Sequence, residues 1–304
     1  MLCLNFLKSE MKNIKYSIII PHKNIPYLLE RCLASIPDND NFQIIIVDDN
    51  SDPKKVDFNN FPGVKRRNTE IYFDKQGKGA GYARNIGLKY AKGKWLIFAD
   101  ADDFFNDCFE SAIEQNFNSS ADIIYYSASS VNSNDLSPGT RHLGTERAIF
   151  NYVPLNNETV ENVKFSNWEP WTRLFNHAFI RDNSITFDEV MVGNDAGFVL
   201  KAGYYSKTIN VDTRPIYCVT YRNDSLSFVI SEKAFDNRFK AKILVNNYMI
   251  DFGKKYFRPI KEEIIEAKKY GFIKTFKMIF IARRYIFHKV KLKLKHLLLM
   301  TITF

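Results

Sequence analysis

An apolar segment that runs directly into three closely spaced carboxylates constrains the fold more than any other part of the chain. Trp95–Phe98 is followed by Asp100, Asp102 and Asp103. Carboxylates this close repel one another unless positive charge lies between them. The apolar run is typical of a buried strand, and open α/β sheets bind ligands at the carboxyl ends of such strands. Because hard divalent cations share oxygen ligands with substrate phosphates, the segment predicts a metal and diphosphate site.

The same acids also suit the start of a helix, which the pattern predicts over 104–117. Asp is favoured at helix N-termini, where it accepts hydrogen bonds from free N–H groups. A helix cap accounts well for one Asp but poorly for three within four positions. The metal site is the preferred interpretation, and the helix cap stays open as the alternative.

Strand-like and helix-like patterns alternate along residues 16–126. Buried strands are predicted at Tyr16–Ile20, Phe42–Val47, Glu70–Phe73, Trp95–Phe98 and Asp122–Tyr126. Apolar residues recur at helical spacing over 28–36, and another helix is predicted over 82–91. Such alternation is typical of a parallel sheet with right-handed crossovers. We therefore expect an α/β fold with a Rossmann-like, mainly parallel sheet flanked by helices.

Polar clusters follow the first two strands as well. Pro21–Asn24 comes after the first strand and Asp48–Asp52 after the second. In a doubly wound sheet these ends are neighbours of the Asp100–Asp103 segment, so the three clusters should line one crevice. A carboxylate after the second strand suits a nucleobase edge or ribose hydroxyls, because it accepts from N–H and O–H donors. A turn carboxylate that satisfies nearby backbone N–H groups is the alternative.

A glycine-rich loop at Gly77–Gly81, followed by Arg84, has the properties of an anion-binding device. Glycines permit close backbone approach, and a guanidinium is a planar donor suited to phosphate. The loop does not follow the first strand, and it matches neither the dinucleotide nor the P-loop pattern. Neither NAD binding nor ATP hydrolysis is indicated.

Taken together, these motifs resemble those of the inverting glycosyltransferases of family 2, which have the GT-A fold. The matching segments are Ser17–Asn24, Ile45–Asp52, Gly81–Gly87 and Phe98–Asp103. A weaker likeness continues through Trp171–Phe175, Gly193–Asp195 and Tyr221-Arg222. The resemblance covers roughly residues 16–228 and does not reach the C-terminal tail.

The resemblance implies a nucleotide-sugar site built from the first two strand ends. Pro21, His22 and Asn24 would border the nucleobase. Asp49 would hydrogen-bond the base, and Asp48 would support that turn. One departure lies in this region, because a lysine occupies position 23, where the family commonly has an aromatic residue.

The resemblance also assigns the remaining acids and Arg84. Asp100 and Asp102 would form the D-x-D element, in which Asp102 or Asp103 binds the Mn2+ or Mg2+ that bridges the diphosphate. The other acidic groups would face ribose or the donor sugar, with Arg84 near the donor. Asp195 would be the catalytic base, although Asn rather than the usual Glu precedes it. An ordinary helix-cap or surface acid is the alternative for Asp195.

The implied mechanism follows from charge. A metal stabilises the negative charge that develops on the departing diphosphate, and a carboxylate removes the proton of the attacking acceptor hydroxyl. A single base on the face opposite the leaving group gives inversion. Trp168 and Trp171 are candidates for stacking on an acceptor sugar, and burial in the core is their alternative.

The C-terminal quarter differs from the rest in charge. Residues 231–304 hold 18 Lys and Arg against 6 Asp and Glu, whereas residues 1–230 hold 25 against 28. A mildly acidic body with a basic, aromatic tail favours an anionic membrane surface over nucleic acid, and we expect 268–304 to provide that contact. A basic amphipathic helix packed on the body is the alternative. Strict alternation over Lys289–Lys295 is strand-like and conflicts with a helix.

Four regions are expected from these patterns: an N-terminal extension at 1–13, a nucleotide-sugar half at 14–126, an acceptor and catalytic-base half at 127–230, and a basic helical tail at 231–304. The scattered cysteines suggest reduced thiols and a cytoplasmic enzyme, peripheral on the inner face of the membrane. No leader pattern is visible at Met1–Glu10, and Met11 suits the start equally well. Leu297–Phe304 is far shorter than the ~20 residues of a membrane-spanning helix.

The leading hypothesis is a metal-dependent inverting glycosyltransferase of hexosyltransferase type. It would move a sugar from a UDP-linked donor to a glycan or lipid-linked acceptor, in capsule or lipopolysaccharide synthesis. One alternative is a non-catalytic nucleotide-sugar or glycan-binding module, which the Asn before Asp195 favours. The other is a sugar nucleotidyltransferase, which the absence of a glycine-rich loop after the first strand disfavours.

Overall fold

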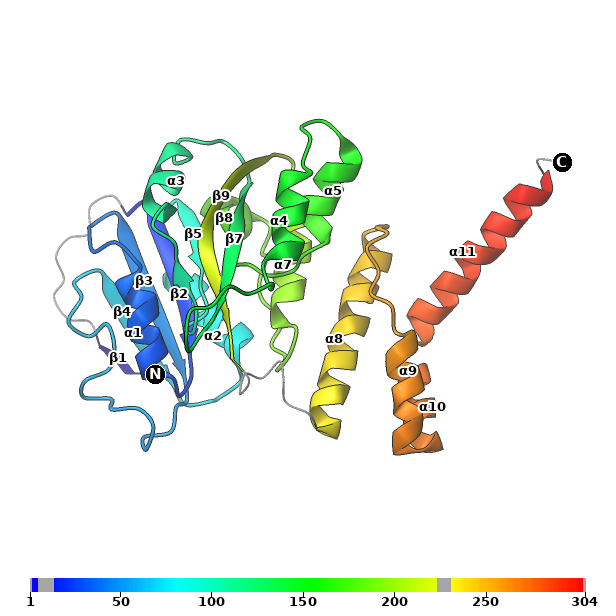
Figure 1. The fold of residues 1–304 in the computed structure, drawn as a ribbon, viewed down its shortest axis with the longest axis horizontal. Coiled ribbons are helices and arrows are strands. Elements are labelled where there is room, and N and C mark those ends of the chain that lie inside the picture. The colour runs from blue at the N-terminus through cyan, green and yellow to red at the C-terminus, as the bar shows by residue number, and fades with distance from the viewer. Residues whose placement is uncertain (1, 5–13, 223–230, 303–304) are drawn as a thin grey trace. The chain divides into compact units, whose positions relative to one another are not determined.

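The computed structural model describes residues 2–4, 14–222 and 231–302, with side chains described for 14–222 and 231–294. The chain forms two compact units, residues 1–228 and 229–304. We call them the sheet unit and the helical unit (Figure 1). The regions predicted at 14–126 and 127–230 share one sheet, so both halves contribute to a single unit.

The sheet unit is built on nine strands in the order β1-β4-β3-β2-β5-β8-β7-β9-β6. Their bounds are β1 Leu2–Leu4, β2 Tyr16–His22, β3 Phe42–Asp49, β4 Thr69–Asp74, β5 Trp95–Phe98, β6 Phe104–Phe105, β7 Ile123–Asn132, β8 Arg173–Asn176 and β9 Ile209–Tyr221. The neighbours β4, β3, β2 and β5 are parallel, as predicted. Beyond β5 the sheet is mixed, because β8 runs antiparallel to both β5 and β7.

Helices cover both faces of this sheet. Their bounds are α1 Pro26–Ala34, α2 Ala80–Tyr90, α3 Phe109–Gln115, α4 Leu143–Phe150, α5 Asn157–Phe165, α6 His177–Asp182 and α7 Asn194–Tyr205. One core cluster joins α1 and α3 to the sheet through Ile18 and Ile20, and the other joins α2, α4, α5 and α7 through Ile19. Every residue of β2 is buried, as expected for a strand covered on both faces, and its centre is the apolar run Ile18–Ile20.

Two predictions of local structure were wrong. The helix predicted over 104–117 is a two-residue strand, β6, followed by the shorter α3. Pairing of Phe104 with Cys218 in β9 overrides the local helical pattern. The stretch 127–162 is rich in Ser, Asn and Thr with little periodicity, which predicts loops, but it contains the end of β7 and the helices α4 and α5. Asn156 caps α5 by accepting from the N–H groups of Glu158 and Thr159.

The helical unit consists of α8 Glu232–Asp251, α9 Lys261–Ala267, the short 3-10 helix η2 Lys268–Tyr270, α10 Phe272–Ile281 and α11 Arg283–Ile302. Its core contains Phe235 and Phe239 of α8, Met278 of α10 and Tyr285 of α11. The alternating stretch at 289–295 is helical, because it continues α11 from this packed start. None of the helices in the described part of the chain combines the length and apolar character needed to cross a membrane.

Candidate active site

The ends of β2, β3 and β5 lie at the same edge of the sheet. His22 lies opposite Asp48 in the parallel register, and Ile19 lies opposite Phe98. The three polar clusters that follow these strands are therefore brought together, which is the arrangement the sequence predicted.

Buried hydrogen bonds fix the turn after β3. Nδ1 of His22 lies 2.8 Å from Oδ2 of Asp48, and Nε2 of His22 accepts from the backbone N–H of Ile25 at 3.2 Å. His22 therefore donates from Nδ1 to the carboxylate. Burial acts to raise the pKa of Asp48, but hydrogen bonds from His22 and Ser51 outweigh it and hold the pKa below its usual value. The buried pair of Asp48 and His22 therefore stabilises the turns that follow β2 and β3.

Asn24 links the same two turns. Its backbone N–H donates to Oγ of Ser51 at 2.8 Å, and its side-chain oxygen accepts from the N–H of Asp52 at 2.7 Å. Asn24 has a φ of 61°, in the left-handed region that Asn tolerates better than most residues. Pro21 is buried within β2 opposite Val47. Its contribution is to the strand end rather than to an exposed surface.

The carboxylate of Asp49 joins the first strand end to the glycine-rich loop. Nζ of Lys23 donates to the Asp49 carbonyl oxygen at 2.8 Å and to its Oδ2 at 3.0 Å. The N–H of Gly79 donates to Oδ1 at 3.0 Å. The lysine that replaces the family's aromatic residue is therefore an ion-pair partner of Asp49.

Arg84 is the centre of the site. Its Nη2 donates to Oδ1 of Asp100 at 2.5 Å, and its Nη1 donates to Oδ1 of Asp195 at 2.6 Å and of Asn194 at 2.8 Å. The guanidinium is buried and lies 5.3 Å from the centre of the Phe187 ring. Burial acts to lower the pKa of Arg84, but Asp195 and Asp100 outweigh it and raise the pKa. One cation thus connects the D-x-D segment to the predicted base.

Close contact between the starts of α2 and α7 makes this connection possible. A Cβ at Gly81 would lie 2.4 Å from the carbonyl oxygen of Asp188 and 2.8 Å from Cβ of Asn194. Only glycine fits there without moving backbone. Gly193, which precedes α7, has a φ of 74° and turns the chain so that Asn194 and Asp195 open the helix.

The environment of Asp195 raises its pKa to about 6. Burial is the main cause, the carboxylates of Asp100 and Glu169 add to it, and Arg84 opposes it. A carboxylate of this pKa is ionised at neutral pH and still basic enough to take a proton. Sequence reasoning missed Glu169, although a carboxylate between two tryptophans, Trp168 and Trp171, was a visible signal.

The acids at 102 and 103 are tied to the end of β9. Oδ1 of Asp103 accepts from the N–H of Thr220 at 2.7 Å, and Oγ1 of Thr220 donates to the carbonyl oxygen of Asp102 at 2.7 Å. Nη2 of Arg222 lies 3.6 Å from Oδ2 of Asp102. Burial and then neighbouring carboxylates raise the pKa of Asp102, and they raise that of Asp103 well above its usual value. Arg222 and Arg141 oppose the rise in the pKa of Asp102, but they do not outweigh burial and the neighbouring carboxylate.

These residues fit a metal that is shared with a substrate. Within the described residues, no group of three or more His, Cys, Asp or Glu side chains is placed to hold a metal ion. Mg2+ at phosphate sites commonly uses only one or two carboxylates together with phosphate oxygens. Asp102 is the better ligand, because its side chain is 28% exposed, whereas Asp103 is buried against Thr220. A cation at Asp102 would stabilise the ionised carboxylates against both the burial and the mutual repulsion that raise these pKa values.

The two tryptophans proposed for the acceptor differ in position. Trp171 is buried and stacks on Tyr217, with ring centres 5.5 Å apart. The hydroxyl of Tyr217 in turn accepts from the N–H of Asp100 at 2.8 Å. Trp171 thus lies in the core beneath the site. Trp168 is half-buried and packs against the other core cluster.

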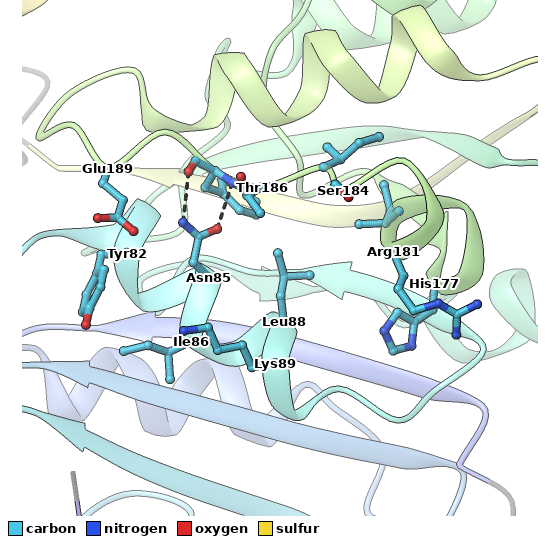
Figure 2. Close-up of a pocket in the computed structure, with 13 residues that line it drawn as sticks. Tyr82, Asn85, Ile86, Leu88, Lys89, His177, Arg181, Ser184, Thr186 and Glu189 are labelled. Carbon is cyan, nitrogen blue, oxygen red and sulfur yellow. Dashed lines mark hydrogen bonds between the residues drawn. The ribbon is translucent and has the colours of Figure 1, made fainter.

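A pocket of about 430 Å³ lies between α2 and the segment 177–189 (Figure 2). Asn85 fixes its wall by donating to the Phe187 carbonyl oxygen at 3.0 Å and accepting from the Phe187 N–H at 2.8 Å. These bonds also hold the chain that leads into Asn194 and Asp195. The acids of the site are not among the described residues that line this pocket.

The family model described as "Glycosyl transferase family 2" matches residues 17–180, more than half of the chain. The chain belongs to glycosyl transferase family 2. The transferase enzyme predicted from the family resemblance is confirmed at the level of the family.

Relatives of this family 2 chain include proteins named as glycosyltransferases in two bacteria. The poly(ribitol-phosphate) beta-glucosyltransferase of Bacillus spizizenii is 26% identical over 221 residues, which cover 69% of this chain and 33% of that protein. Glycosyltransferase GlyA of Streptococcus pneumoniae is 26% identical over 228 residues, which cover 72% of this chain and 32% of that protein. The chain thus spans about a third of the length of these relatives.

Solved structures share the fold. The S. aureus TarS 1-349 structure in complex with UDP-GlcNAc has a TM-score of 0.61 at 21% identity, covering 80% of this chain and 68% of that one. The mannosyltransferase PcManGT of Pyrobaculum calidifontis, in complex with GDP-Man and Mn2+, has a TM-score of 0.55 at 14% identity, covering 92% and 76%. The predicted α/β fold of GT-A type is confirmed.

Proposed function

We propose that the chain transfers a sugar, with inversion, from a nucleoside-diphosphate sugar to a hydroxyl of a glycan or lipid-linked acceptor. The observation that carries the proposal is Arg84, which hydrogen-bonds Asp100 and Asp195 at the same time. The buried guanidinium of Arg84 thus holds Asp100, which is assigned to the donor, at a fixed distance from Asp195, which is assigned as the base.

The donor half is assigned to the first three strand ends. Asp49, held by Lys23 and Gly79, would bind the nucleobase, and Asp100 would face the ribose or the sugar. Asp102 would hold the cation. When bound, Mn2+ or Mg2+ supplies positive charge that stabilises the departing diphosphate.

The acceptor half is assigned to α7 and the loop before β8. Asp195 would remove the proton of the acceptor hydroxyl, and its pKa of about 6 suits that task near neutral pH. Arg84 orients the carboxylate through Oδ1, so that the other oxygen is available for the proton. Attack opposite the leaving group inverts the anomeric centre.

A UDP-linked donor and a surface-polymer acceptor are the favoured substrates. TarS of similar fold was solved with UDP-GlcNAc, and the Bacillus relative is named for poly(ribitol-phosphate). These likenesses support synthesis of a teichoic-acid, capsule or lipopolysaccharide type of glycan. A lipid-linked acceptor would lie at a membrane, so the proposal includes a cytoplasmic enzyme that is peripheral on the inner face of that membrane.

The test is a screen of UDP-, GDP- and CDP-sugars for nucleoside diphosphate release, with and without Mn2+. We expect release from one donor class, dependent on Mn2+ and lost in Asp102→Asn. Asp182→Asn, whose side chain is 61% exposed and pairs with the exposed Arg181, is the matched control and should keep full activity. Full activity in Asp102→Asn would contradict the assignment.

A non-catalytic binding module is the second candidate. The Arg84 ion pair neutralises Asp195, and Asn194 supplies no second charge in place of the family's Glu. Calorimetry that shows donor binding, combined with no turnover for any acceptor, would favour the module over the transferase.

A further inference from the structure

Helix α10 presents large apolar side chains to solvent. Five residues form what we call the apolar face of α10: Phe272, Ile273, Phe276, Ile279 and Phe280, with exposed fractions of 84%, 85%, 62%, 40% and 58%. Their spacing of one, four, seven and eight residues from the first places them on one side of a helix. A contiguous exposed apolar surface of this kind marks an interaction site rather than ordinary surface.

The opposite side of α10 is already anchored. Met278 is buried in the core of the helical unit with Phe239 of α8. Nζ of Lys274 pairs with Asp236 at 2.5 Å and with Glu232 at 2.9 Å, both on α8. Rotating α10 to bury its apolar face would break these ion pairs and expose Met278. The apolar face therefore points outward because the helix is held from behind.

Exposed basic residues occur within α10 and along α11, and this part of the sequence contains no acids. From Lys268 to the last residue, 304, the chain contains no Asp or Glu. Lys277 lies within α10 and is exposed, and the first half of α11 adds exposed basic residues. They are Arg283, Arg284, Lys289, Lys291 and Lys293. Among the residues whose side chains the structure describes, Arg284 is the one of these five that pairs with an acid, Asp251 of α8.

We propose that the apolar face of α10 docks on an anionic lipid bilayer. Phe272, Phe276 and Phe280 would enter the headgroup layer, and the cations of α11 would bind lipid phosphates. A surface contact is the appropriate mode, because no described helix is suited to crossing a bilayer. A second copy of this chain is a poorer occupant, because two copies would bring the exposed cations of α10 and α11 together, and these charges would repel each other.

Docking would serve the proposed function by bringing the enzyme to membrane-bound acceptors, but it rests on separate observations. Binding to vesicles is measured with no donor and no acceptor present. A failure of docking is therefore distinguishable from a failure of transfer.

The experiment is flotation of the full chain with vesicles of phosphatidylcholine, alone or mixed with phosphatidylglycerol. We expect binding to the anionic vesicles and little binding to phosphatidylcholine alone. The triple variant Phe272→Ser, Phe276→Ser, Phe280→Ser should lose about tenfold or more in partition coefficient. The matched control is Phe150→Ser, Val153→Ser, Leu155→Ser, which removes three exposed apolar side chains from the sheet unit and should bind as before.

Two further measurements keep the test decisive if the triple variant folds poorly. The single variant Phe276→Trp should show a blue-shifted tryptophan emission component when anionic vesicles are added. The same variant in buffer without vesicles should not show this component. Lys289→Gln, Lys291→Gln, Lys293→Gln should weaken anionic-vesicle binding several-fold and reduce its dependence on salt.

Three outcomes would overturn the proposal. The first is no binding to anionic vesicles, and the second is equal binding by the wild-type chain and the folded Phe triple variant. The third is a dimer of the wild-type chain, by light scattering, that the Phe triple variant converts to monomer. That result would assign the apolar face to a second copy.

Discussion

The two units of this molecule handle charge in opposite ways. In the sheet unit, the cation of Arg84 is buried and meets Asp100 and Asp195 at hydrogen-bond distance. In the helical unit, Lys289, Lys291 and the other cations of α11 are exposed beside apolar side chains. The first arrangement is complete within the chain, whereas the second leaves charge and apolar surface for an external partner. The contacts of Arg84 are thus formed before any ligand binds, whereas the exposed lysines of α11 would gain anionic partners only on binding.

Replacing Asp195 with Asn should have the largest effect on activity, because it changes the completed site of the sheet unit and leaves the helical unit unchanged. The amide keeps the shape and can still accept from Arg84, but it cannot take a proton. We expect the transfer rate to fall by about 10²–10⁴-fold. Donor affinity, measured by calorimetry, should stay within about twofold, because Asp195 is assigned to the acceptor and not to the donor. This corresponds to a change in binding free energy of roughly ±0.5 kcal/mol. A rate near that of the wild type would remove Asp195 from the mechanism.

Arg84→Gln should lower the transfer rate nearly as much as Asp195→Asn does. It should also lower the free energy of unfolding. Removing one partner from a largely buried ion pair leaves two carboxylates uncompensated, which costs about 2–4 kcal/mol. Denaturant unfolding measures this cost. The control is Arg181→Gln, which breaks an exposed pair with Asp182 and should change stability by less than about 0.5 kcal/mol. Similar losses in both variants would show that the burial of Arg84 does not matter.

Gly81→Ala tests whether contact between α2 and α7 sets the site. The added methyl would meet the Asp188 carbonyl oxygen, so the two helices must separate, at a cost of about 1–3 kcal/mol. Gly144→Ala is the control, because its nearest atom is the end of the Asn167 side chain at 3.3 Å. Thermal melting should show a loss for the first variant and little change or a gain for the second.

The pH dependence of transfer should be the mildest effect. The pKa of Asp195 is raised to about 6, so protonation removes the base as pH falls below that value. At pH 5, kcat/KM should be about tenfold below its plateau. Rates measured in a constant-ionic-strength buffer series check this. A profile that stays flat down to pH 4 would contradict the assignment of Asp195 as base.

How much of this could be predicted depended on sequence distance. The strand ends after Ile20, Val47 and Phe98 were predicted, because each pattern lies within a few residues and parallel strands end at one edge. The contact between Arg84 and Asp195 spans 111 positions, so only the family resemblance could place both in one site. No local pattern records that α2 and α7 touch.

Other features were missed for a related reason. The strand at Phe104 exists only because β9 pairs with it, and β9 lies more than 100 residues later. Glu169 acts on Asp195 from a loop whose position depends on β8. The apolar face of α10 could be suspected from its periodicity, but periodicity alone does not tell which side is packed. The ion pairs of Lys274 decide that.

The hydrogen bonds of Thr220 have a mechanical consequence. Thr220 clasps Asp102 and Asp103 just two residues before Arg222, where the described part of the sheet unit ends. Because Thr220 hydrogen-bonds both acidic residues, any displacement of the end of β9 would also displace the turn at Asp102 and Asp103, and with it the oxygen atoms offered to a cation.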